Sequence, residues 1–129
     1  MQKKQAELDY VLITHYHSDH IGVFAPASAK KDDGRYLLSG LTGVASIIPI
    51  KKIIDSGNDF RPTGEKTESS FVDQLKEYRN FIQILEKTKG VAYEKFTVGS
   101  HSQIRLKNDA NDYPEFVVKN LFSNGVIAA

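Results

Sequence analysis

Cysteine is absent from the 129-residue sequence. Without thiols the chain can form no disulfide and no thiolate metal site, so a metal could be held only by histidine and carboxylate side chains. A charge excess is also lacking, since 17 Lys and Arg residues stand against 16 Asp and Glu residues. We therefore expect no stable nucleic-acid binding, because the basic surface that such binding needs is missing.

Long hydrophobic runs are missing as well. No apolar stretch approaches the roughly 20 residues of a membrane span, and the first residues, "MQKKQAELDYV", lack the apolar region of a signal peptide. We expect no membrane partner for this chain, and a cytoplasmic location by default. A hydrophobic fraction of 40% is typical of a soluble globular protein, and the length allows one domain at most.

Histidine is scarce, yet three of the four histidines lie within six positions: His15, His17 and His20, with Asp19 between the last two. They follow residues 8–14, which are apolar and rich in β-formers and predict a buried strand. Imidazoles two positions apart on the loop after a strand can converge on one cation, most readily zinc, with manganese or iron possible. Asp19 and His20 could serve a second metal about 3.5–4 Å away, and two ions would activate a bridging water. A histidine-rich loop can also be plain solvated surface.

The rest of the chain alternates helical and extended patterns. Apolar residues at three- and four-residue steps predict a helix over 68–88, and a similar face predicts a helix over 41–48 that Pro49 ends. We further expect a helical turn from His20 to near Pro26, a polar loop at 28–35, and strands at 50–55, 93–98, 103–107 and 115–122. This order indicates an α/β fold.

The stretch "LDYVLITHYHSDHIG" resembles the H-x-H-x-D-H signature of the metallo-β-lactamase superfamily. The resemblance implies an αβ/βα sandwich and a hydrolase site with one or two ions, usually zinc, at a sheet edge. It implies His15 and His17 as ligands of the first metal, and Asp19 and His20 as ligands of the second. Asp19 is then also the candidate catalytic residue, because its carboxylate could accept a proton from the activated water.

Two further stretches, "IPIKKIIDSGNDF" and "YEKFTVGSHSQIRL", are similar to the hydrolase domain of bacterial DNA-uptake (competence) proteins. That similarity implies a phosphodiester substrate, although the superfamily signature itself fits a small-molecule substrate equally well. The resemblance extends over residues 8 to about 125.

A complete site in this superfamily also has a third histidine for the first metal, a bridging aspartate and a final histidine. His101 is the only histidine left, and its place in a turn favours a solvated residue over a ligand. Asp55 stands at the end of a predicted strand, just as His15 stands at the end of the strand predicted at 8–14. Asp55 could therefore support the site from the same sheet edge. It could equally open the turn Asp55–Gly57.

We therefore expect residues 1–129 to form a single, incomplete metallo-β-lactamase-like domain, a partial αβ/βα sandwich. Unpaired strand edges and an uncovered sheet face favour self-association, which predicts a homo-oligomer. Two functions remain open: a metal-dependent hydrolase, active in a full-length parent, and a catalytically incompetent remnant that at most binds metal.

Overall fold

A parallel sheet of three strands lies at the centre of the structure, a computed structural model that describes residues 6–24, 28–31, 34–57 and 69–129. The strands β1 (Val11–Ile13) and β5 (Ala92–Lys95) pair with opposite edges of β4 (Lys52–Asp55). In the register, Ile13 lies beside Asp55, and Asp55 lies beside Lys95. The carboxyl ends of the three strands therefore meet at one sheet edge, where α/β folds place their sites.

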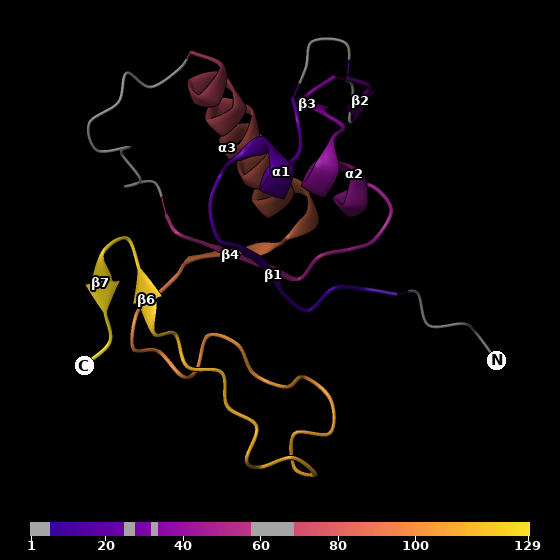
Figure 1. Ribbon diagram of the computed structural model, residues 1–129. Helices are drawn as coiled ribbons and strands as arrows, with labels where there is room; N and C mark the ends of the chain where they lie inside the picture. Colours follow the sequence, from indigo (N-terminus) through magenta and orange to yellow (C-terminus); the bar gives the residue numbers. More distant parts are fainter. Residues whose placement is uncertain (1–5, 25–27, 32–33, 58–68) are drawn as a thin grey trace, which may run out of the picture.

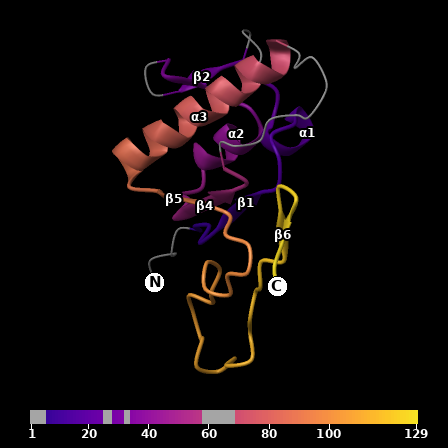
Figure 2. The ribbon, with the colours of Figure 1, turned by 90° about the vertical axis from the view of Figure 1, so that its left-hand side faces the viewer.

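The connections between these strands contain the helices. Two short helices, α1 (Ser18–Ile21) and α2 (Gly40–Ala45), and a small sheet of β2 (Lys30–Lys31) and β3 (Tyr36–Leu37) follow β1, and the long helix α3 (Ser69–Lys89) joins β4 to β5. All three helices lie on one face of the parallel sheet (Figures 1 and 2). This is expected when both crossovers are right-handed and step across the sheet in the same direction.

Helix α3 supplies four of the twelve buried residues of the core. Tyr78, Phe81, Ile82 and Leu85 lie on its buried face and pack against strand residues that include Ile53. Each such side chain contributes roughly 1.5–3 kcal/mol when it leaves water. The prediction of a helix over 68–88 is confirmed, because one apolar stripe of three- and four-residue steps runs through its whole length.

The C-terminal segment covers part of the opposite face of the sheet, where Leu12 stays 45% exposed. Ile54 is fully buried although it lies outside the helix-side core. The backbone N–H of Arg105 donates to the Tyr10 hydroxyl at 3.2 Å, and the Gln103 amide donates to Glu94 Oε2 at 3.1 Å. Figure 2 shows this segment below the sheet, with the helices above it.

The strands expected at 103–107 and 115–122 are wrong. The segment instead forms turns and a short hairpin of β6 (Phe122–Ser123) and β7 (Val126–Ile127). Side-chain amides take the hydrogen bonds that a strand ladder would use. Asn120 Nδ2 donates to the Thr97 carbonyl at 3.0 Å, and Gln103 Oε1 accepts from the Thr97 N–H at 2.8 Å. Such local bonds compete directly with sheet pairing.

Three smaller expectations also need correction. The first helix begins at Ser18 and ends at Ile21, earlier than the expected turn from His20 to near Pro26; residues 25–27 lie outside the described part. Helix α2 ends at Ala45, short of Pro49, because Ser46 directs its hydroxyl and its N–H to the Gly43 carbonyl and tightens the last turn. In the stretch 28–35, residues 29–31 and 34–35 are exposed as expected, residues 32–33 lie outside the described part, and Lys30–Lys31 pairs with Tyr36–Leu37.

The α/β class is confirmed, with strands and helices alternating through β5. The αβ/βα sandwich stays a prediction, because β2–β3 and β6–β7 are separate two-stranded sheets in the part of the chain that is described. The single incomplete domain and the homo-oligomer stay predictions too. None of the described helices combines the length and the apolar character that crossing a bilayer requires.

Candidate metal centre

The histidine loop, residues 14–17, follows the carboxyl end of β1. The side chain of Tyr16 anchors this loop to the rest of the fold. The Tyr16 side chain is buried, and its hydroxyl donates to the Gly57 carbonyl at 2.8 Å. His15, half-buried, and His17, exposed, flank this tyrosine. Because neighbours in an extended segment point to opposite sides, a buried Tyr16 directs the two imidazoles to a common, outward side.

Helix α1 brings the other two residues of the motif to the same place. His17 stands at its N-cap position, and the His17 carbonyl accepts the N–H of His20 at 3.0 Å and of Ile21 at 3.1 Å. Ile21 is fully buried and fixes the helix against the core. Asp19 and His20 therefore project from the turn that directly follows the H-x-H loop.

All four predicted residues lie together. His15, His17 and Asp19 each offer one ligand atom, and these atoms lie within 4.8 Å of one another. His20 completes the group from the side: its ring centroid is 3.8 Å from that of His15, and its Nε2 is 3.5 Å from Asp19 Oδ2. Their assignment as ligands of one or two ions, and that of Asp19 as the catalytic residue, stay predictions.

The donor set fits a metal ion. Two imidazoles and a carboxylate are ligands that zinc, iron and manganese accept. Around one zinc ion, tetrahedral ligand atoms stand roughly 3.3–3.5 Å apart. The ligand atoms of His15, His17 and Asp19 lie within 4.8 Å of one another, so an ion would have to draw them somewhat closer. The three side chains thus lie close to the spacing that a metal site needs.

The protonation of His15 also suits ligation. Partial desolvation lowers the pKa of His15, and positive charge on the neighbouring His20 and His17 lowers it further, against the opposing effect of Asp19. The neutral imidazole is the form that coordinates a metal. His15 therefore needs little deprotonation to bind at neutral pH.

Asp55 ends the strand next to β1, beside Ile13 in the register. Its side chain is only 1% exposed. Its Oδ1 accepts from the Gly57 N–H at 2.7 Å and from the Tyr93 hydroxyl at 2.8 Å, while Oδ2 accepts from the Tyr78 hydroxyl at 2.9 Å. The expected turn at Asp55–Gly57 is present, and the carboxylate is enclosed by donors.

Tyr78 and Tyr93 are polar partners that the sequence pattern did not single out. Tyr78 reads as one apolar position in the stripe of α3, and Tyr93 as a strand residue. A buried carboxylate requires donors, and tyrosine is a side chain that can pack in a core and still donate. Only the burial of Asp55 could have pointed to them.

These tyrosines make stability sensitive to alkali. Desolvation and the negative charge of Asp55 raise the pKa of Tyr78 and of Tyr93 above the model-peptide value of 10.0. Tyrosines in the unfolded chain then ionise first, so their contribution is fully present below about pH 10 and is lost as the pH rises towards the folded pKa values. We expect the free energy of unfolding, measured by urea denaturation between pH 8 and 12, to fall above pH 10. Tyr93→Phe should reduce the slope; an equal slope in wild type and variant would contradict this.

His101 is exposed in its turn, as expected, and lies outside the ligand group. Among residues 6–24, 28–31, 34–57 and 69–129, the cluster of His15, His17 and Asp19 is the one group of three or more such side chains close enough to hold an ion. The described part of the chain therefore brings together the four residues of the H-x-H-x-D-H motif, and His101 does not join them.

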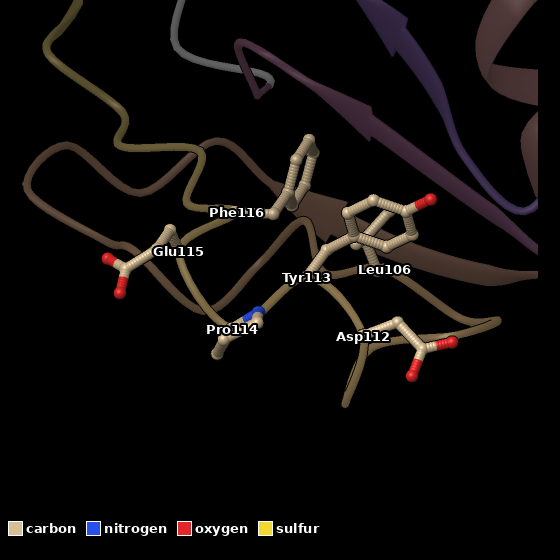
Figure 3. Close-up of a pocket in the computed structure, with 6 residues that line it drawn as sticks. All are labelled: Leu106, Asp112, Tyr113, Pro114, Glu115 and Phe116. Carbon is tan, nitrogen blue, oxygen red and sulfur yellow. The ribbon is translucent and has the colours of Figure 1, made fainter.

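A separate hollow of about 600 Å³ is lined by residues of the C-terminal segment. That segment runs on the far side of the sheet from α1 (Figures 1 and 2). Figure 3 shows the rings of Tyr113 and Phe116 in the wall of the hollow, with the carboxylates of Asp112 and Glu115 pointing away from them. It is also lined by Leu106 and Pro114, and it offers no imidazole. The possible metal ligands of the described chain therefore lie in the histidine loop and α1.

Comparison with protein families gives one match. The sequence model of the metallo-beta-lactamase superfamily matches residues 2–38, which include β1, the H-x-H loop and α1. Curated proteins and solved structures give no significant match. The matched segment contains the cluster of His15, His17 and Asp19, so the family match and the possible metal site fall on the same part of the chain, and both fit the metallo-β-lactamase motif.

Proposed function

We propose that this chain carries the metal-binding loop of a metal-dependent hydrolase, in which an activated water attacks an ester-type bond. One observation carries the proposal: two imidazoles and a carboxylate converge at the carboxyl end of β1, within the segment that matches the superfamily. Zinc is the proposed metal, as one or two ions, with manganese or iron as alternatives.

Each residue of the cluster has a distinct task in this proposal. A bound metal would lower the pKa of water from about 15.7 to about 7 and polarise the substrate. His15 and His17 hold the ion. The Asp19 side chain, 76% exposed, accepts the proton from the attacking water, and His20 beside it keeps that carboxylate near His15.

A phosphodiester is the proposed substrate, by the resemblance of "IPIKKIIDSGNDF" and "YEKFTVGSHSQIRL" to DNA-uptake hydrolase domains. The exposure of the cluster supports a large substrate. His17 and Asp19 are exposed, and the His20 side chain is 41% exposed, so a polymer backbone could reach the centre without entering a deep pocket.

A second candidate is a catalytically incompetent remnant that binds metal and turns nothing over. The ligand count favours it, because the described residues bring no additional histidine or acidic group to His15, His17 and Asp19 beyond the adjacent His20. Metal affinity would then be modest, since water would have to complete the coordination shell.

The deciding experiment measures metal content and turnover on the same sample. The protein is stripped with a chelator and titrated with zinc or manganese. Bound metal is then counted by elemental analysis, and hydrolysis of bis(p-nitrophenyl) phosphate is followed. Metal-dependent hydrolysis that Asp19→Asn abolishes is the expected result. Binding without hydrolysis selects the remnant, and absence of binding contradicts both candidates.

A further inference from the structure

The turn Asp55–Gly57 touches the histidine loop directly. The Tyr16 hydroxyl donates to the Gly57 carbonyl at 2.8 Å. In the parallel register Asp55 lies beside Ile13, so the residues that follow each strand leave the sheet side by side. Since Tyr16 stands between His15 and His17, a shift of this turn would shift both imidazoles.

The turn itself is held from several elements. Tyr78 on α3 and Tyr93 on β5 donate to the two oxygens of Asp55, at 2.9 and 2.8 Å. Asn124, in the turn between β6 and β7, donates to the Ser56 carbonyl at 2.8 Å. Three separate parts of the chain therefore fix a stretch of three residues.

A side chain at position 57 would be strained by the backbone conformation and would require the Lys95 side chain to move. The φ of Gly57 is 83°, a left-handed value that side chains disfavour, and an added Cβ would approach Lys95 Cδ to 2.6 Å. The Gly57 N–H also closes the turn by donating to Asp55 Oδ1 at 2.7 Å. The carbonyl that receives Tyr16 is consequently locked in one orientation.

Helix α3 links the turn to the histidine loop a second time. The ring of Tyr16 lies against that of Tyr78, with centroids 5.3 Å apart, and the ring of His17 meets that of Phe71 edge-on at 5.7 Å. Phe71 and Tyr78 are seven positions apart, so they share one face of the helix. The same rigid element thus contacts the carboxylate of Asp55, Tyr16 and His17.

Burial of a carboxylate at this point requires a reason. An ionised group without partners is strongly unfavourable in a core. A buried carboxylate that has all its hydrogen-bond donors instead fixes one arrangement of the residues around it. Two of the three donors to Asp55, Tyr78 and Tyr93, lie 23 and 38 residues away in sequence, and the third is the nearby Gly57 N–H. These hydrogen bonds hold the Asp55 carboxylate in one place, next to the loop that carries the proposed metal ligands His15 and His17.

We propose that Asp55 is a positioning residue for the metal ligands: held by Tyr78 and Tyr93, it fixes the turn whose Gly57 carbonyl anchors Tyr16 and thereby sets His15 and His17. This inference rests on the proposed metal-binding function. Partners that orient metal ligands without touching the metal commonly change affinity about 10–100-fold.

The test compares zinc affinity with stability. Asp55→Asn keeps the shape and removes the charge, and Tyr78→Phe removes one donor; each should weaken the zinc Kd at least about tenfold. The Kd is measured by competition with a chromophoric chelator, well below the melting temperature of each variant. Tyr36→Phe is the matched control, because it also removes a buried hydroxyl, from a ring that packs on Phe81, and should leave the Kd unchanged.

A purely structural role would lower the melting temperature and leave the Kd of the folded protein as in wild type, and this outcome would overturn the proposal. Should Asp55→Asn fail to fold, the zinc Kd values of Tyr78→Phe and Tyr93→Phe decide the question alone.

Imidazole ¹⁵N–¹H spectra of the metal-free protein give a second readout. Tyr78→Phe should move the His15 and His17 resonances but not that of His101. Wild type without zinc affinity would end the proposed function, whereas unmoved resonances would end the positioning role.

Discussion

His15→Ala is expected to weaken zinc binding by at least about 100-fold, because loss of an orienting partner alone costs 10–100-fold and His15 is a proposed ligand. His15 is also the member of the cluster that contacts both other imidazoles, with ring centroids 4.9 Å from His17 and 3.8 Å from His20. Its removal therefore takes away a nitrogen ligand and the packing that keeps the others together.

His101→Ala is the matched control for this experiment, since it removes the fourth histidine of the chain from an exposed turn. Zinc affinity is measured by chelator competition and stoichiometry by elemental analysis. Equal losses of affinity in His15→Ala and His101→Ala would contradict the site and indicate non-specific binding to surface imidazoles.

His20→Ala then distinguishes one ion from two. With a single ion held by His15, His17 and Asp19, this variant should keep the stoichiometry and weaken the affinity only through lost packing on His15. With two ions, of which Asp19 and His20 hold the second, the stoichiometry should fall from two to one. The two outcomes differ in metal count, which is independent of any assay substrate.

Elements with a periodic apolar signal of their own could be predicted from the sequence. Helix α3 matches its expected range to within a residue at each end, and the expected strands at 8–14 and 50–55 contain β1 and β4. Such elements form because one whole face of apolar residues is buried, and the spacing of those residues in the local sequence is enough to predict the helix or strand. The H-x-H-x-D-H loop could be predicted for the same reason, because its residues are neighbours in sequence.

Elements decided by distant side chains could not be predicted. The stretches 103–107 and 115–122 contain strand-forming residues, yet the amide of Asn120 bonds to Gln103, 17 positions away, at 2.6 Å. Asp55 meets Tyr78 and Tyr93 over separations of 23 and 38 residues. A local pattern carries no information about such partners. The sequence therefore allowed either a turn or a supporting role for Asp55. In the structure Asp55 opens the turn and accepts hydrogen bonds from the two tyrosines.

Gly22→Ala is expected to destabilise the fold by about 2–4 kcal/mol, for two reasons that act together. Gly22 ends α1 with φ 99° and ψ 162°, a region that is essentially restricted to glycine. An added Cβ would also lie 2.7 Å from the backbone nitrogen of Gly40, and backbone cannot move aside as a flexible side chain can. The contact joins the end of α1 to the start of α2.

Two other glycines separate these effects. Gly43 lies within α2 with no atom within 4 Å of an added Cβ, so Gly43→Ala should stabilise the protein by about 0.5–1 kcal/mol. Gly90 has φ 65° and equally open surroundings, so Gly90→Ala should cost about 1–2 kcal/mol from backbone strain alone. Urea denaturation of the three variants gives the ranking, and a cost for Gly22→Ala no larger than that for Gly90→Ala would refute the close approach.

The same substitution should reach the metal centre, because Gly22 follows the helix that bears Asp19 and His20. Displacement of α1 from α2 would turn both side chains away from His15, whereas His17, fixed by Tyr16 and by its contact with Phe71, would stay in place. Folded Gly22→Ala should therefore bind zinc more weakly than wild type, while Gly90→Ala, at the far end of α3, should bind it equally well. If Gly22→Ala lowers stability but keeps full affinity, α1 does not depend on its contact with α2 to present Asp19 and His20.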